Sequence, residues 1–189
     1  MTTGGPRAAL VRAFVALELD DGLHERLAAL GAELRPAFPG LRWVRPDGVH
    51  LTLRFLGPTS PAQVERLGAL LGEAAVSCPV TTASVTGLGL FPERGSPRVL
   101  WLGVCVAEPV LALQASCERI AVETGFDPEP RLFRAHLTLG RWRDRARVPS
   151  LPAVDLGTTP LSTLTLFRSD LGPGGSVYTP LGRWRLTAG

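Results

Sequence analysis

One four-residue motif occurs twice in this chain: His-Leu-Thr-Leu stands at His50–Leu53 and again at His136–Leu139. The sequence contains three histidines, so two of the three have a threonine two positions after them. Each motif lies in a run that predicts a β-strand, where successive side chains point to opposite faces. Each strand should therefore present an imidazole and a hydroxyl on one face and two leucines on the other.

This combination of side chains could cleave a phosphodiester without a metal ion. Two imidazoles can supply a general acid and a general base near neutral pH. Two hydroxyls, those of Thr52 and Thr138, can donate hydrogen bonds to phosphate oxygens while charge shifts between them. The attacking and leaving oxygens of an in-line displacement lie on opposite sides of phosphorus. We therefore expect His50 and His136 to come from two strands that face a common cleft.

The charge of the chain is mildly basic and comes from one type of cation. The formal net charge is +3, the pI is about 9.2, and all 20 basic residues are arginine. Without lysine the chain cannot form a Schiff base or a lysyl-adenylate, and it lacks a phosphate-loop lysine, which excludes ATP-dependent nucleotidyl-transfer ligases and standard nucleoside triphosphatases. The planar fork of arginine is well suited to binding phosphate.

The remaining composition predicts no cofactor, no metal and no membrane span. The three cysteines, Cys78, Cys105 and Cys117, form no Cys-x-x-Cys pair, so neither a zinc site nor a disulfide scaffold is expected. The apolar stretches are far shorter than a membrane span, and the N-terminus lacks the apolar core of a signal peptide. We expect a monomeric, cytoplasmic protein in which residues 1–10 are flexible.

Hydrophobic periodicity and turn residues predict the order of the elements. Asp20 and Ser60 stand at positions typical of helix caps, and Ser60 with Gln63 forms a capping-box pattern. The expected helices begin after Asp20, at Pro61 and at Pro109, and residues 143–156 are expected to be a loop. The expected strands are residues 12–19, 41–45, 49–56, 80–90, 99–106, 131–139, 161–168 and 177–186.

This grouping of strands and helices favours an α+β fold over a parallel doubly wound sheet. The two motifs lie 136 − 50 = 86 residues apart, and each belongs to a comparable strand-and-helix unit. We expect residues 1–189 to form a single two-lobed domain. Its two pseudo-symmetric lobes would each be an antiparallel sheet with helices packed outside, and both would face a central active-site cleft.

The chain resembles the two-histidine phosphoesterase superfamily, and within it the RNA 2′,3′-cyclic phosphodiesterases, also called 2′-5′ RNA ligases. The pair of motifs in its flanking context makes the resemblance specific, and it runs nearly end to end. One departure is Ala135, because this family usually has proline before the second histidine; we expect the local backbone to be slightly looser. The resemblance rests on residues 12–17, 42–46, 50–57, 98–104, 133–141 and 174–178.

The resemblance implies an enzyme that opens a nucleoside or RNA 2′,3′-cyclic phosphate to a 2′-phosphate, with 2′-5′ RNA ligation as the reverse reaction. It implies that His50 donates a proton to the departing ribose oxygen and that His136 accepts the proton of water. It also implies that Thr52 and Thr138 hydrogen-bond the non-bridging phosphate oxygens. The residues alone leave open which histidine is the acid and which is the base.

Other residues are candidates for substrate contacts. By strand alternation Arg54 and Arg134 share the face of their neighbouring histidines, where they would contact phosphate or RNA backbone or else be solvated rim charges. Arg141 stands where its strand should end, and the cluster 141–147 with its tryptophan is either an RNA-tracking surface or a solubilising loop. Phe133 and Tyr178 are placed, by analogy, to stack on a nucleobase.

Two other functions stay open at this point. The same mechanism could act on another substrate, such as the cyclic phosphate of ADP-ribose left by tRNA splicing. A non-catalytic module that recognises RNA ends would belong to a different class. Turnover of a simple nucleoside 2′,3′-cyclic phosphate would separate the enzymes from the binding module, and comparison with the ADP-ribose compound would separate the two enzymes.

Overall fold

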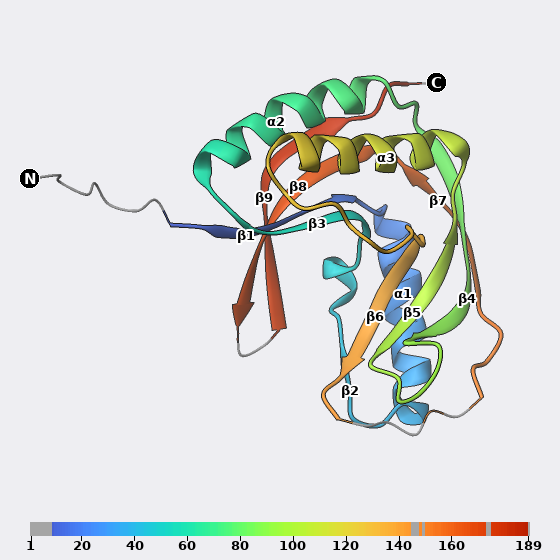
Figure 1. Ribbon diagram of the computed structural model, residues 1–189. Helices are drawn as coiled ribbons and strands as arrows, with labels where there is room; N and C mark the ends of the chain where they lie inside the picture. Colours follow the sequence, from blue (N-terminus) through green and yellow to red (C-terminus); the bar gives the residue numbers. More distant parts are fainter. Residues whose placement is uncertain (1–8, 145–147, 149, 173–174, 189) are drawn as a thin grey trace, which may run out of the picture.

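The computed structural model describes residues 9–144, 148, 150–172 and 175–188 (Figure 1). Most of the predicted flexible N-terminus, residues 1–8, and the arginine-cluster residues 145–147 lie outside the described residues.

Within the described chain a single antiparallel sheet contains all nine strands. Its order is β7-β4-β5-β6-β3-β1-β8-β9, with β2 added alongside β6. The strands are β1 (Val11–Leu17), β2 (Leu41–Trp43), β3 (Leu51–Thr59), β4 (Thr81–Phe91), β5 (Val99–Cys105), β6 (His136–Trp142), β7 (Asp155–Leu161), β8 (Thr163–Gly172) and β9 (Gly175–Arg185).

The two motif strands, β3 and β6, lie at the centre of this sheet and divide it into two halves. They are joined through one residue pair, Leu51 with Leu137, and three further strands follow on each side. The predicted α+β fold is confirmed, and the two expected sheets are the two halves of one curled sheet (Figure 1). The two motifs therefore lie where the two halves of the sheet meet.

Three α-helices bury apolar faces against this sheet, and the predicted caps are present. The Asp20 carboxylate accepts the Leu23 N–H at 2.9 Å at the start of α1 (Asp21–Leu34). Ser60 and Gln63 form the capping box of α2 (Pro61–Val76), and α3 spans Glu108–Glu123. Helices α2 and α3 pack together over β3, β8 and β9, whereas α1 contacts β7 in the other half (Figure 1). Two 3₁₀ turns, η1 (Arg35–Ala37) and η2 (Pro46–Gly48), flank β2.

The structure differs from the predicted elements at two places. Strand β6 begins at His136, five residues later than predicted. Strand β7 was not predicted: it begins at Asp155, within the last two residues of the predicted loop 143–156, and ends at Leu161. Strand β7 contains Pro160, which cannot donate to a ladder and argues against a strand in sequence. Because β7 is an edge strand, it needs to pair only with β4, and it tolerates the proline.

Candidate active site

The two motifs meet at the centre of the sheet. Leu51 and Leu137 are completely buried on the helix side of the sheet. Because successive side chains of a strand alternate between its faces, His50, Thr52, His136 and Thr138 lie on the face away from the helices. Of these four, His50, Thr52 and Thr138 line one pocket. His136 is not part of the described lining, and its charge acts on His50 from nearby.

Both imidazoles are oriented in the same way. Nδ1 of His50 lies 2.9 Å from the carbonyl oxygen of Gly48, and Nδ1 of His136 lies 2.7 Å from that of Arg134. A carbonyl oxygen can only accept, so each Nδ1 carries a proton and donates it. Each Nε2 is thereby left for the substrate, as an acceptor in the neutral ring and as a donor in the charged ring.

Aromatic rings fix the planes of the two imidazoles. His50 stacks on Phe14, with ring centroids 4.6 Å apart and an interplanar angle of 24°, and meets the edge of Tyr178 at 5.1 Å. His136 meets Phe91 edge-on at 5.1 Å and Trp101 at 6.1 Å. Trp101 can lie there only because its cross-strand partner is Gly89, where an added Cβ would come within 2.0 Å of the indole ring.

The surroundings lower the pKa of both histidines. Burial lowers the pKa of His50 from 6.5 to about 4; the hydrogen bond to Gly48 opposes this shift, and the nearby His136 charge adds to it. Burial also lowers the pKa of His136, and the charges of Arg141 and Arg134 lower it further. Both rings are therefore mainly neutral at pH 7 in the free protein, and a bound phosphate anion would raise both pKa values.

This shift makes the folding stability depend on pH. The unfolded chain binds the His50 proton near pH 6.5 and the folded chain only near pH 4. The contribution of His50 to the free energy of unfolding should therefore be complete above pH 6.5 and be lost progressively as pH falls from 6.5 to about 4. The full shift corresponds to roughly 3 kcal/mol. Urea unfolding at several pH values should show a smaller loss for His50→Gln than for the wild type. Parallel losses in the two proteins would contradict the shifted pKa.

Each motif strand contains a β-bulge at the last leucine of its motif. The register of β3 against β1 skips Leu53, and the register of β6 against β5 skips Leu139. A bulge reverses the alternation of faces beyond it. The next side chains on the cleft face are therefore Phe55 and Arg141, each five residues after its histidine, and both line the pocket.

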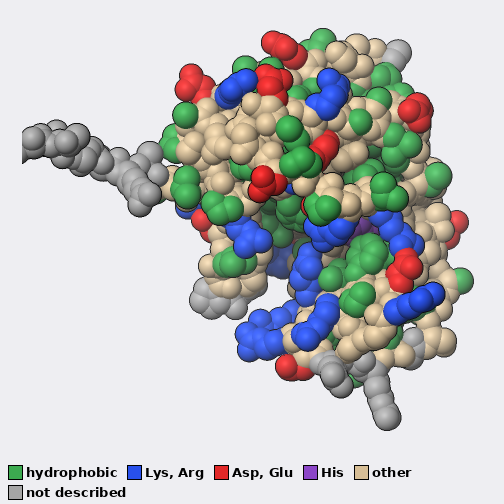
Figure 2. Space-filling view, in the orientation of Figure 1, with side chains coloured by type: hydrophobic (Ala, Val, Ile, Leu, Met, Phe, Trp, Pro, Cys, Tyr) green, Lys and Arg blue, Asp and Glu red, His purple; other side chains and the backbone are tan. Residues whose placement is uncertain are grey.

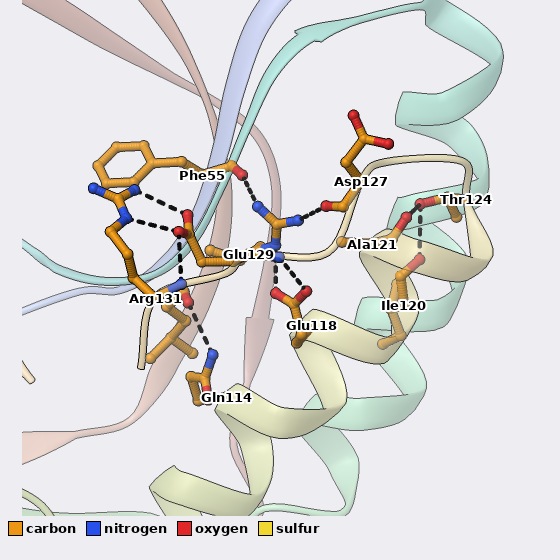
Figure 3. A network of polar contacts seen from close by, with 11 residues as sticks. Phe55, Gln114, Glu118, Ile120, Ala121, Thr124, Asp127, Glu129 and Arg131 are labelled. Atoms are coloured by element: carbon orange, nitrogen blue, oxygen red, sulfur yellow. Dashed lines mark hydrogen bonds and ion pairs between the residues drawn. The ribbon is translucent and has the colours of Figure 1, made fainter. Parts of the chain in front are cut away.

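The bulge explains why Arg54 does not share the face of His50, contrary to the sequence expectation. Its side chain is 7% exposed and forms an ion pair with Glu118 of α3. The guanidinium also donates to the backbone oxygens of Phe55, at 2.6 Å, and Asp127 (Figure 3). Arg54 thus links strand β3 to helix α3 and to the segment that follows this helix, and it does not reach the phosphate-binding face.

The same network positions Arg131 at the pocket. The Glu118 carboxylate also accepts the N–H of Glu129 at 2.9 Å. The Glu129 carboxylate in turn accepts from Arg131 Nε at 2.7 Å and Nη2 at 3.0 Å (Figure 3). These hydrogen bonds from Arg131 lower the pKa of Glu129 to about 2. Arg131 was not among the predicted site residues, because the network that holds it includes residues distant in the chain.

Replacing Arg54 with methionine should destabilise the fold by about 3–5 kcal/mol, because it leaves the Glu118 carboxylate without its charge partner. Arg54→Met combined with Glu118→Leu should recover part of this loss. As a matched control, Arg66→Met breaks an exposed ion pair of 2.9 Å with Glu123 and should cost less than about 1 kcal/mol. Equal losses for the two single variants in chemical denaturation would show that the Arg54 network is not a stabilising element.

The other predicted contacts are divided between the pocket and its surroundings. Tyr178 lines the pocket beside His50, as does Arg141 next to Thr138. Arg134 forms an ion pair with Glu93, and its guanidinium lies 4.7 Å from the Trp101 ring centroid, on the rim beside His136. Phe133 packs half-buried against the hydrophobic core and does not face the described pocket lining.

The pocket in front of the two motifs has a volume of about 580 Å³, and we call it the reaction pocket. Three residues of its lining, Arg12, Phe14 and Phe55, were not predicted from the sequence. The only sequence signal for them is that they lie on or beside a motif strand.

Within the described residues, no three His, Cys, Asp or Glu side chains come together in a way that could hold a metal ion. None of the described helices has the length and apolar content of a membrane span.

Comparisons with known proteins agree with this geometry. The model of the family described as LigT like Phosphoesterase matches residues 17–101. An RNA 2′,3′-cyclic phosphodiesterase of Methanothermobacter thermautotrophicus is 33% identical over 183 residues, which is 93% of this chain and 99% of that protein. The chain belongs to the LigT-like phosphoesterase family.

Further matches cover more than nine-tenths of this LigT-like phosphoesterase. An RNA 2′,3′-cyclic phosphodiesterase of Thermus thermophilus is 33% identical over 93% of this chain and 90% of its own length. The crystal structure of E. coli LigT complexed with 3′-AMP superimposes with a TM-score of 0.83 and 29% identity, covering 94% of this chain and 99% of that one. These matches include both motif strands, although the family model ends before the second.

Proposed function

We propose that this LigT-like phosphoesterase hydrolyses RNA or nucleoside 2′,3′-cyclic phosphates to 2′-phosphates without a metal ion, and that it can also perform reversible 2′-5′ RNA ligation, with a 5′-hydroxyl in the place of water. Two observations carry the proposal: both imidazoles have Nδ1 hydrogen-bonded to a carbonyl oxygen, which leaves Nε2 for the substrate, and His50 shares its pocket with Thr52 and Thr138. Relatives that match most of its length are named RNA 2′,3′-cyclic phosphodiesterase.

The four motif residues divide the reaction between them. His136 Nε2 accepts a proton from water as the water oxygen attacks phosphorus. The bond between phosphorus and the ribose 3′ oxygen breaks, and His50 Nε2 donates a proton to that oxygen. The products are a 2′-phosphate and a 3′-hydroxyl. Thr52 and Thr138 donate hydrogen bonds to the non-bridging oxygens as negative charge grows on them.

His50 must carry a proton when the substrate is bound, although its pKa in the free protein is about 4. The bound phosphodiester supplies a negative charge that raises this pKa within the complex. In ligation a 5′-hydroxyl takes the place of water: His136 accepts its proton as its oxygen attacks phosphorus, the bond between phosphorus and the ribose 3′ oxygen breaks, and His50 donates a proton to that oxygen. In cleavage of the 2′-5′ bond, the reverse of ligation, the two roles exchange by microscopic reversibility, and no further residue is required.

A product-resolved assay tests the proposal. A short RNA with a 2′,3′-cyclic phosphate end should be converted to the 2′-phosphate form, and excess EDTA should leave the rate unchanged. Loss of activity in EDTA that a divalent cation restores would rule out the metal-free mechanism. Turnover of the cyclic phosphate of ADP-ribose alone would point to the second substrate class. Binding of the RNA end without turnover would point to a recognition module.

We also propose that the protein acts as a monomer in the cytoplasm. The strands at the two ends of the main strand order, β7 and β9, contain proline, at Pro160 and Pro180, and β2, which pairs only with β6, is three residues long. Proline lacks the N–H that pairing with a further strand would require. This feature supports a sheet that does not extend into a second copy.

A further inference from the structure

A second, smaller pocket adjoins the reaction pocket. It has a volume of about 380 Å³, and its lining includes Arg42, Arg45, Arg141 and Arg143; we call it the arginine pocket. Five residues line both pockets, so the two form one continuous groove. Figure 2 shows arginine side chains gathered around a hollow in this face of the molecule. The shared residues are Val44, Gly48, Arg141, Ser176 and Tyr178.

The charge in this groove has one sign. No aspartate or glutamate belongs to the described lining of either pocket. Among the four arginines, the described residues give an ion-pair partner only to Arg45, which lies 3.7 Å from Asp47 in an exposed pair. An exposed pair at this distance neutralises little of the charge. The arginine pocket therefore presents several guanidinium groups to whatever occupies it.

The fold brings two of these arginines directly opposite each other. In the pairing of β2 with β6, Arg42 stands across from Arg141. Like charges at directly opposed positions destabilise a sheet, and the core packing of Leu41 and Trp142 on the other face does not require them. A phosphate between the two guanidinium groups would turn this repulsion into two charge-assisted hydrogen bonds.

The spacing along β6 connects the arginines to the reacting phosphate. Thr138 lies in the reaction pocket, Arg141 lines both pockets, and Arg143 lines the arginine pocket. Arg143 lies one residue beyond the end of β6, and five residues of extended chain from Thr138 span about 16 Å. The guanidinium groups of Arg141 and Arg143 thus lie on the same side of Thr138 along the chain. Trp142 is 7% exposed and donates its indole N–H to Pro39 at 3.2 Å, so this part of the cluster offers charge, and its tryptophan belongs to the core.

We propose that the arginine pocket binds the phosphodiester backbone of the RNA chain on the 5′ side of the cyclic phosphate. This inference rests on the proposed function, because a terminal cyclic phosphate in the reaction pocket leaves the rest of the chain only its 5′ side. It adds that the preferred substrate is an oligoribonucleotide and that Arg42, Arg45 and Arg143 determine this preference. Guanidinium groups that contact phosphates bind RNA without reading its sequence.

The decisive variant is Arg42→Gln/Arg143→Gln, which leaves Arg141 and the four motif residues in place. The matched control is Arg66→Gln/Arg119→Gln, which removes the same charge from exposed positions on α2 and α3. The kcat/KM of a pentaribonucleotide with a 2′,3′-cyclic phosphate end is compared with that of a nucleoside 2′,3′-cyclic phosphate. The ratio of the two should fall by about 10-fold or more in the groove variant and stay unchanged in the control.

Binding is measured in parallel on a 3′-phosphorylated pentaribonucleotide, which cannot react. The groove variant should bind it more weakly, and the dependence of log Kd on log salt should decrease by about 0.7 for each lost phosphate contact. If the wild type hydrolyses neither cyclic substrate, the proposed function fails. The binding comparison then still tests whether the arginine pocket binds the RNA backbone. An unchanged ratio together with unchanged binding, or equal effects in the control, would overturn the inference.

Discussion

His50→Ala and His136→Ala should each lower kcat for cyclic phosphate hydrolysis by about 100-fold or more. This is the usual scale for removing a positioned general acid or base, and the Nδ1 hydrogen bond of each histidine leaves its Nε2 for the substrate. Steady-state kinetics on a nucleoside 2′,3′-cyclic phosphate measures the loss. Near-wild-type activity in either variant would remove that histidine from the mechanism.

The double variant His50→Ala/His136→Ala should be little slower than either single variant, because the two groups act as a unit. His24→Ala serves as the matched control, since this third histidine lies on α1, with Nε2 3.4 Å from the Val49 oxygen, and should leave kcat unchanged. Because His50 stacks on Phe14, thermal unfolding of each variant should be recorded alongside the kinetics. Losses that simply multiply in the double variant would argue against a concerted acid–base pair.

Thr52→Val and Thr138→Val should each lower kcat by about 10- to 1000-fold, the range seen when an oxyanion donor is removed. Valine keeps the β-branched shape that a strand favours and deletes only the hydroxyl. Rates are measured on the same nucleoside substrate. Thr→Ser at each position keeps the hydroxyl and should recover much of the activity. An intact rate in the Thr52→Val/Thr138→Val double variant would require another explanation for the repeated motif.

The sequence by itself determined the reactive groups and their local presentation. Because alternation along a strand is a local property, the sequence alone assigns His50 and Thr52 to one face and Leu51 to the buried face. The helix caps at Asp20 and Ser60 could also be predicted from the sequence, because a cap depends only on residues within one helical turn. The α+β class followed from the order of such local elements.

Tertiary structure decided what depends on partners distant in the chain. The bulges at Leu53 and Leu139 are defined only by the neighbouring strands, so alternation alone misplaced Arg54 and did not bring Phe55 onto the cleft face. The burial of Arg54 depends on Glu118, which is 118 − 54 = 64 residues away in sequence.

The pairing of β2 with β6 is also non-local, and it alone brings Arg42 across from Arg141 to form a basic groove. Strand β7 could not be predicted for the same reason. Its proline is tolerated only in an edge strand, and the order of all the strands in the sheet decides which strands lie at an edge. Periodicity reports which face of its own element a residue occupies. The partner strands decide which other residues share that face and whether a charge there meets a carboxylate or an open pocket.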